Sequence, residues 1–188
     1  MWRKRINFWH VASLAGGVLY PVLVYVSLHH APSFALIGVG LGLIALRLWG
    51  VRHDSAAARW AVALLLAAAA LAILAFLAPD LAVMAYPSLI SIAIAGVFGA
   101  SLIWPPSVIE RLARLREPEL SPDGQLYTRR VTQVWTAFLV LNAAIAAATA
   151  LWGTVEQWTL WNGLFSYLAM GVLFTGEIAL RRFIRRST

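Results

Sequence analysis

Six long apolar stretches alternate with polar connections along the chain. They cover residues 8–28, 33–49, 60–77, 81–104, 131–152 and 157–180. A helix needs about 20 predominantly apolar residues to cross a bilayer, and each stretch is close to that length. The pattern predicts an all-α membrane protein, a compact bundle of six transmembrane helices in a single domain over residues 1–188.

Basic residues mark one side of this predicted bundle. All 15 lysines and arginines fall in every second polar segment, namely within 3–5, 47–59, 111–130 and 181–186. Because Lys and Arg concentrate in cytoplasmic loops, both termini are expected in the cytoplasm. Arg47 is assigned here to the second connection, together with Arg52 and Arg59.

Composition supports a membrane location and excludes several kinds of chemistry. The chain is 61% hydrophobic and only 12% charged, whereas soluble domains carry about 25% charged residues. It has no cysteine, which excludes disulfides, thiolate metal sites and cysteine nucleophiles. The net charge of +7 sits at the ends of apolar runs, so membrane lipids, rather than nucleic acid, are the expected partners.

The longest polar stretch predicts a short amphipathic helix on the cytoplasmic surface, at about 107–117. Ser107 and Glu110 have the spacing of a capping box, and Pro118 should end the helix. Glu110 is expected on its polar side. Residues 121–124, Ser-Pro-Asp-Gly, are typical of a turn before the fifth span.

Around this helix the sequence places a candidate patch for a partner or for lipid headgroups. Its members are Arg111, Arg114, Tyr127, Arg129 and Arg130. Two interpretations stand side by side: a staple that pins the loop to anionic headgroups, and a docking surface for a cytoplasmic protein or for an acidic, acylated substrate.

Polar residues inside apolar spans are costly and therefore candidates for function. The candidate intramembrane site consists of Tyr86, Pro87, Asn142, Asn162 and Glu177. Asn142 is expected to form a hydrogen bond to a neighbouring helix. Glu177 has the spacing for an ion pair with Arg181; the alternative is a proton or cation site.

A proline within the fourth span predicts a kink at Tyr86-Pro87. Ser88 and Ser91 are expected to satisfy the carbonyls that the proline leaves free. Such a break often borders a cavity, which Asn162 and Tyr167 could face. A plain kink is the alternative.

Cofactors and catalytic sites are not indicated. His10 and His53 lie near the inner side and His29 and His30 near the outer side, so they form no metal or haem site. No phosphate-binding loop, Ser-His-Asp set or carboxylate pair is present. The sequence therefore predicts no cofactor and no enzyme.

Small residues within the spans, such as Gly38, Gly40 and Gly42, let helices approach closely. They favour tight packing within the bundle; a homodimer is the alternative.

Several short motifs carry a resemblance to a known family. They are Tyr86-Pro87, Trp104-Pro105-Pro106, residues 109–114, 127–132 and 135–138, Asn142, Trp161-Asn162-Gly163 and Glu177. Together they resemble uncharacterised bacterial inner-membrane proteins encoded with aryl-polyene (xanthomonadin-type) lipid biosynthesis genes and, more distantly, intracellular septation protein A. The resemblance implies a bacterial inner membrane and an accessory role in the cell envelope, and it supplies no catalytic residues.

Three functions remain open, in this order. The first is a non-enzymatic accessory protein that scaffolds cytoplasmic lipid- or polyene-synthesis enzymes or division proteins. The second is a small transporter or flippase for a lipid-like substrate. The third is a membrane enzyme acting on acyl chains.

Overall fold

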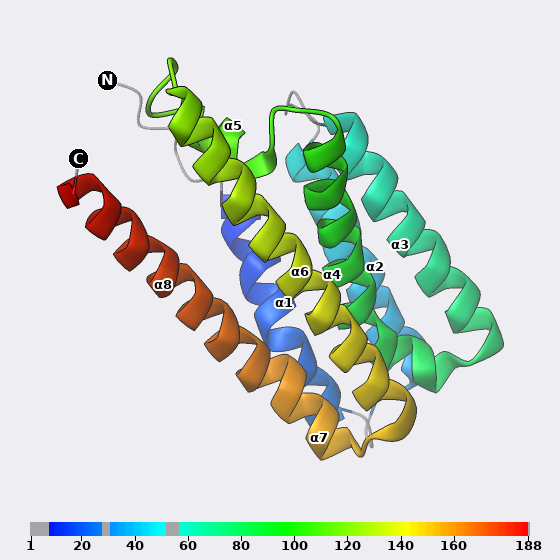
Figure 1. The fold of residues 1–188 in the computed structure, drawn as a ribbon. Coiled ribbons are helices and arrows are strands. Elements are labelled where there is room, and N and C mark those ends of the chain that lie inside the picture. The colour runs from blue at the N-terminus through cyan, green and yellow to red at the C-terminus, as the bar shows by residue number, and fades with distance from the viewer. Residues whose placement is uncertain (1–7, 28–30, 52–56, 188) are drawn as a thin grey trace.

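The chain folds almost entirely into helices. The computed structural model describes residues 8–27, 31–51 and 57–187, with side chains within 15–27, 31–49 and 58–179, and this part contains no strand. Its helices, in order, are α1 (Phe8–Ser27), α2 (Ser33–Val51), α3 (Ala57–Leu77), α4 (Pro79–Ile103), α5 (Val108–Arg114), α6 (Pro122–Trp152), α7 (Val155–Leu160), the π-helical η1 (Trp161–Phe165) and α8 (Ser166–Ser187) (Figure 1). The prediction of an all-α protein is confirmed.

Several of these helices have the length and polarity of membrane spans. Among the described residues, Ala58–Leu77, Pro79–Ile103 and Pro122–Trp152 are long and apolar enough to cross a membrane, and Ala15–Ser27 and Ser33–Trp49 are shorter apolar helices. Large apolar side chains cover their outer surfaces; Phe76, for example, is 89% exposed. The chain is therefore a helical membrane protein.

Helix α4 lies at the centre of the bundle. It packs along α6 on one side and along α3 and α2 on another. Its buried positions include many alanines, such as Ala82, Ala85 and Ala93, which allow close approach of the neighbouring backbones. At one end of α4 lies α5 and at the other lies α7 (Figure 1); these are called the α5 end and the α7 end below.

Helix α5 forms as its capping signal predicts. The Ser107 side chain accepts a hydrogen bond from the Glu110 backbone N–H, and the Glu110 carboxylate accepts one from the Ser107 N–H. The position predicted for Glu110 is wrong, because this side chain is buried and not on the polar side. The capping bonds and an ion pair to Arg114 at 2.7 Å hold it there.

The predicted turn at residues 121–124 is wrong. These residues form the first turn of α6, in which Ser121 is the N-cap and Pro122 the first helical residue. The Ser121 hydroxyl accepts a hydrogen bond from the Gly124 N–H at 3.2 Å. Proline favours the first helical position as strongly as it favours turns, so the helix extends well before the apolar span.

Helix α8 departs from the compact bundle that the sequence predicts. It continues directly from η1, which packs against α1 and α6 at the α7 end, but among the described residues it has no comparable packing with either helix further along. Gly171 and Gly176 face open space, and Val172 is 72% exposed. Glycines and a polar threonine, Thr175, give this part of α8 little apolar surface to pack against the bundle.

Candidate functional site

Side chains from other helices form hydrogen bonds with backbone carbonyls of α4 next to Pro87. Because proline has no N–H, the carbonyl of Val83 loses its helical partner. The Tyr20 hydroxyl of α1 donates a hydrogen bond to that carbonyl at 2.9 Å. One residue further, the Trp158 indole N–H of α7 donates to the Met84 carbonyl at 2.9 Å. The break thus joins α4 to α1 and α7.

The predicted roles of the two serines are therefore wrong. The Ser88 hydroxyl donates to the Ala85 carbonyl at 2.8 Å, not to the Val83 carbonyl. Ser91 faces α6, where its hydroxyl accepts a hydrogen bond from the Asn142 side-chain amide at 3.0 Å. A serine reaches only carbonyls of the preceding turn, whereas the tyrosine comes from another helix. The interhelical hydrogen bond predicted for Asn142 is confirmed.

Two tyrosine rings meet beside this break. The ring centroids of Tyr20 and Tyr86 lie 4.5 Å apart at an interplanar angle of 46°, and both residues are buried. Helix α2 passes them at Gly40, where a Cβ atom would lie 3.2 Å from the Tyr86 ring and 3.3 Å from Leu71. The glycine therefore lets α2 approach close to the ring pair.

A charged side chain lies on this aromatic pair. The guanidinium carbon of Arg47 lies 6.0 Å from the Tyr86 ring centroid, within range of a cation–π interaction. Its Nη2 atom lies against α1, only 2.7 Å from where a Cβ of Gly17 would stand. Arg47 is therefore inside the bundle. Its assignment to the second connection is wrong, because α2 extends to Val51.

Helix α8 contributes a third tyrosine. The Tyr167 hydroxyl lies 3.4 Å from the carbonyl oxygen of Gly17, to which it donates. Arg47 Nη2 lies against the same residue, Gly17. We call Arg47, Tyr20, Tyr86 and Tyr167 the Arg47 cluster; its members come from α2, α1, α4 and α8.

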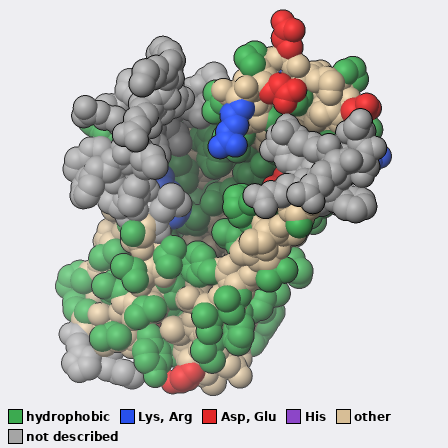
Figure 2. All heavy atoms as spheres, turned by 90° about the vertical axis from the view of Figure 1, so that its left-hand side faces the viewer, with side chains coloured by type: hydrophobic (Ala, Val, Ile, Leu, Met, Phe, Trp, Pro, Cys, Tyr) green, Lys and Arg blue, Asp and Glu red, His purple; other side chains and the backbone are tan. Residues whose placement is uncertain are grey.

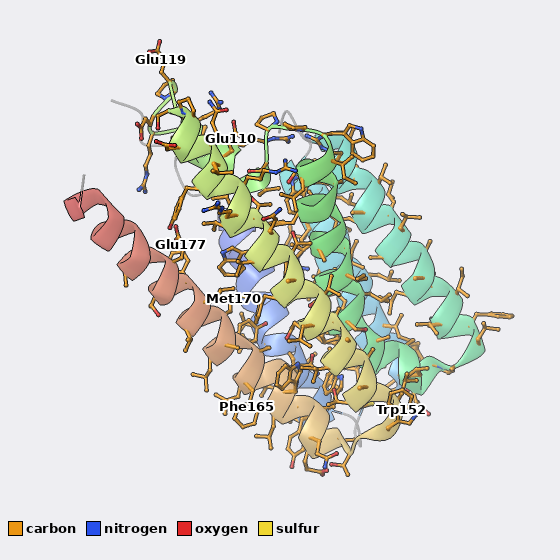
Figure 3. The ribbon with its side chains drawn as sticks, in the orientation of Figure 1. Glu110, Glu119, Trp152, Phe165, Met170 and Glu177 are labelled. Carbon is orange, nitrogen blue, oxygen red and sulfur yellow. The ribbon has the colours of Figure 1, made fainter. Side chains whose placement is uncertain are left out.

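The intramembrane residues predicted as one site occupy separate places. Tyr86 and Pro87 belong to the Arg47 cluster or adjoin it. The Asn162 side-chain amide is buried and donates to the Trp158 carbonyl at 2.8 Å, within its own helical segment. Glu177 lies towards the α5 end, on the side of α8 that faces α6 (Figure 3).

Glu177 has a partner that the sequence did not suggest. The Tyr127 hydroxyl of α6 lies 3.4 Å from a carboxylate oxygen of Glu177 and 3.5 Å from its carbonyl oxygen. The ion pair predicted with Arg181 lies outside the described side chains. Tyr127 therefore faces α8, not the predicted patch.

Most arginines of the predicted patch bind the protein's own loop. The Arg111 Nε donates to the Pro106 carbonyl at 3.0 Å, and the Arg129 Nη1 donates to the Leu102 carbonyl at 2.9 Å. Arg114 binds the Glu110 carboxylate and the Pro118 carbonyl. Beside them lies a shallow depression of about 490 Å³, lined by Pro105, Pro106, Glu110, Arg114 and Gln125. Three of the four arginines thus bind backbone carbonyls of this connection and of the end of α4, and Arg129 and Arg130 are the exposed ones.

The face between α8 and the bundle is hollowed. Figure 2 shows the hollow in the half of the molecule nearer the α5 end, with hydrophobic side chains on its floor. Leu168 and Phe174 of α8 are about half exposed. In a bilayer this face would be open to lipid.

The described part of the chain contains no group of three or more His, Cys, Asp or Glu side chains that could hold a metal ion. The four histidines fall outside the described side chains.

Comparison with protein-family models, curated proteins and solved structures found no match. The geometry is therefore the basis for the functional proposal.

Proposed function

We propose that this protein is a multi-pass inner-membrane protein that binds a lipid-like amphiphile and assists its movement, as a small transporter or flippase. The opening between α8 and the bundle supports this proposal. A lipid reaches such a protein from the side, through the membrane, and the hollow between α8 and the bundle (Figure 2) is open on that side.

The proposed topology has six spans with both termini in the cytoplasm. The six apolar ranges of the sequence coincide with helical segments, except for Leu28, which lies outside the described residues, and Trp104, which directly follows α4. Arg59 in the first turn of α3, Arg114 at the end of α5 and Arg130 in the polar first part of α6 all lie towards the α5 end. The positive-inside rule then favours the α5 end as the cytoplasmic one.

Helix α8 is held at two points and open between them. At the α7 end it continues from η1, and the Tyr167 hydroxyl binds α1 at Gly17. Near the α5 end, the Tyr127 hydroxyl contacts Glu177 at 3.4 Å. That contact is long for a hydroxyl–carboxylate hydrogen bond, so it is a weak closure. Its opening would widen the entrance between α6 and α8.

The scaffold hypothesis has less support than the sequence suggested. A docking surface needs free charged side chains, but Arg111 and Arg114 bind backbone carbonyls of the α4–α6 connection and Arg129 binds one in the last turn of α4. These bonds account for the arginines without a cytoplasmic partner. An accessory role in envelope lipid or polyene synthesis is compatible with lipid binding and is part of this proposal.

The test is to close the opening and measure lipid movement. Tyr127→Cys with Glu177→Cys places a thiol on each side of the entrance, in a chain that has no other cysteine. A short, reductively cleavable bifunctional thiol reagent then joins α6 to α8. In vesicles, unlinked protein should speed the transfer of nitrobenzoxadiazole-labelled phosphatidylglycerol to the outer leaflet, measured by dithionite bleaching. Cross-linking should stop this transfer, and cleavage should restore it.

A matched control is a cross-link at the α7 end. The Ser33 hydroxyl of α2 donates a hydrogen bond to the Asp80 carboxylate of α4 at 2.7 Å. The same reagent on Ser33→Cys with Asp80→Cys therefore joins two helices that are already packed. This link should leave lipid transfer unchanged. Wild-type protein that transfers no more lipid than protein-free vesicles would contradict the proposed function, as would transfer that persists with α6 and α8 joined.

A further inference from the structure

The position of Arg47 is unusual for an arginine near the end of a membrane helix. It is four residues before the end of α2 at Val51, which is roughly 6 Å along the helix axis. Arginines so close to a helix end extend towards the headgroups and keep their charge hydrated. The Arg47 side chain instead extends to the Tyr86 ring and to Gly17, into the protein.

The guanidinium lies near the middle of the bundle. Gly17 is ten residues before the end of α1 at Ser27, and therefore roughly 15 Å from the α7 end. The hydrocarbon core of a bilayer is about 30 Å thick. A cation at this depth is costly and marks a functional position by default.

The neighbouring hydroxyl is free to bind a ligand. The Tyr86 Oη atom is buried and forms no hydrogen bond with the described residues. Buried hydroxyl groups nearly always have a partner, because burial without one is costly. The Arg47 cluster therefore joins a phenol donor that has no acceptor among the described residues to a guanidinium. Arg47 Nη2 and the Tyr167 hydroxyl both lie against Gly17.

From this geometry we infer that the Arg47 cluster binds the anionic headgroup, a carboxylate or a phosphate, of a single-chain amphiphile. A guanidinium can donate two parallel hydrogen bonds to such a group. The Tyr86 hydroxyl would donate a third. The hydrocarbon chain would lie in the hollow between α8 and the bundle, and this part rests on the proposed function.

Glycines make room for this arrangement. A Cβ at Gly17 would stand 2.7 Å from Arg47 Nη2, and a Cβ at Gly16 would stand 2.6 Å from Leu43 Cδ2. Both contacts are closer than non-bonded atoms allow. The adjacent glycines therefore let α2 place a long side chain between α1 and α4 without pushing the helices apart.

The test measures equilibrium binding, which does not require transport. The full chain in phosphatidylcholine nanodiscs is titrated with radiolabelled dodecanoate by scintillation proximity. Dodecyl phosphate should displace dodecanoate, whereas dodecanol, acetate and inorganic phosphate at equal concentration should not. Arg47→Gln should weaken binding by about tenfold or more and Tyr86→Phe by a few-fold, as expected for charged and neutral hydrogen bonds.

Arg130→Gln is the matched control, because it removes the charge of an exposed arginine elsewhere; it should bind like wild type. Equal binding of dodecanoate by wild type and by both the Arg47→Gln and Tyr86→Phe variants would overturn the inference. Equal competition by dodecanol would overturn anion recognition, and equal competition by acetate or inorganic phosphate would overturn the lipid headgroup. Arg47-dependent binding without lipid transfer in vesicles would refute the proposed function alone.

Discussion

At the scale of single residues, Pro87 affects the packing of the bundle interior as well as the shape of α4. It removes one backbone donor, and the freed Val83 carbonyl becomes the acceptor that fixes Tyr20. The fixed Tyr20 ring in turn supports the Tyr86 ring, on which Arg47 rests. A missing N–H in α4 thus leads, step by step, to the placement of a charge inside the membrane region.

This order of causes predicts a coupling between two substitutions. Tyr20→Phe keeps the ring contact with Tyr86 but leaves the Val83 carbonyl without a donor, and should lower stability by about 1 kcal/mol. Pro87→Ala restores the backbone N–H, so Tyr20→Phe should cost much less in that background. Unfolding of both single variants and the double variant in detergent, followed by tryptophan fluorescence, measures the coupling. Additive effects would show that Tyr20 acts through its ring alone.

Residue chemistry was only partly predictable from the sequence. The Asn142 hydrogen bond could be expected, because a carboxamide in an apolar span needs a partner. Arg47 was missed because a charge two residues before Trp49 looks like part of a connection. Its direction depends on Gly17 and Tyr86, which come from other helices, and no local pattern specifies such contacts.

At the scale of elements, the connection between α4 and α6 is a braced turn. The Arg111 and Arg114 side chains each bind a carbonyl of that connection, and Arg129 binds one in the last turn of α4. Glu110 forms hydrogen bonds with Ser107 and Arg114. Helix α5 has only seven residues, too few to be stable alone. Its capping bonds and its packing on α6 therefore determine whether it forms.

Removing the cap should loosen this element without unfolding the bundle. Ser107→Ala deletes the acceptor for the Glu110 N–H and should destabilise α5 by about 1 kcal/mol. We expect faster backbone hydrogen exchange over residues 108–114, measured by mass spectrometry in detergent. Exchange within α4, which is buried at the centre, should stay unchanged. Ser107→Thr, which keeps a capping hydroxyl, is the control and should exchange like wild type; equal protection in all three proteins would refute the role of the cap.

Elements were predictable where the signal was local. Ser107 and Glu110 specify the start of α5 through neighbouring atoms, and the apolar lengths specify the long helices. The start of α6 was misplaced, because Ser-Pro-Asp-Gly satisfies the rules of a turn and of a helix N-terminus equally well. The chain after residue 124 decides between them, since it continues with helix-compatible residues up to the apolar span.

At the scale of the whole molecule, α8 differs from the other long helices in having one weakly packed side. It carries two exposed glycines, Gly171 and Gly176, and a Cβ atom added at either would meet no neighbouring atom. The separation of α8 could not be read from hydropathy, because apolar length does not distinguish a helix packed on protein from one facing lipid. Contacts between helices distant in the sequence decide it.

The orientation of the molecule in the membrane can be tested with single cysteines, because the natural chain has none. Glu119 is exposed at the α5 end (Figure 3) and Glu156 is exposed at the α7 end. With the α5 end in the cytoplasm, a membrane-impermeant maleimide should label Glu156→Cys in intact cells but Glu119→Cys only after the inner membrane is opened. Labelling is read as a mass shift of the purified protein.

The two cysteine variants control for each other, because each should react fully once the membrane is permeabilised. Reversed labelling would place the basic loops outside, contrary to the positive-inside rule. Labelling of both variants in intact cells would place both sites outside, which requires an even number of spans between them. Only the span of α6 separates Glu119 from Glu156 in the proposed topology, so this result would contradict it. The expected pattern would also set the direction of Arg47: its guanidinium would point away from the nearer, cytoplasmic headgroups and towards the membrane centre, where a headgroup in transit would need it.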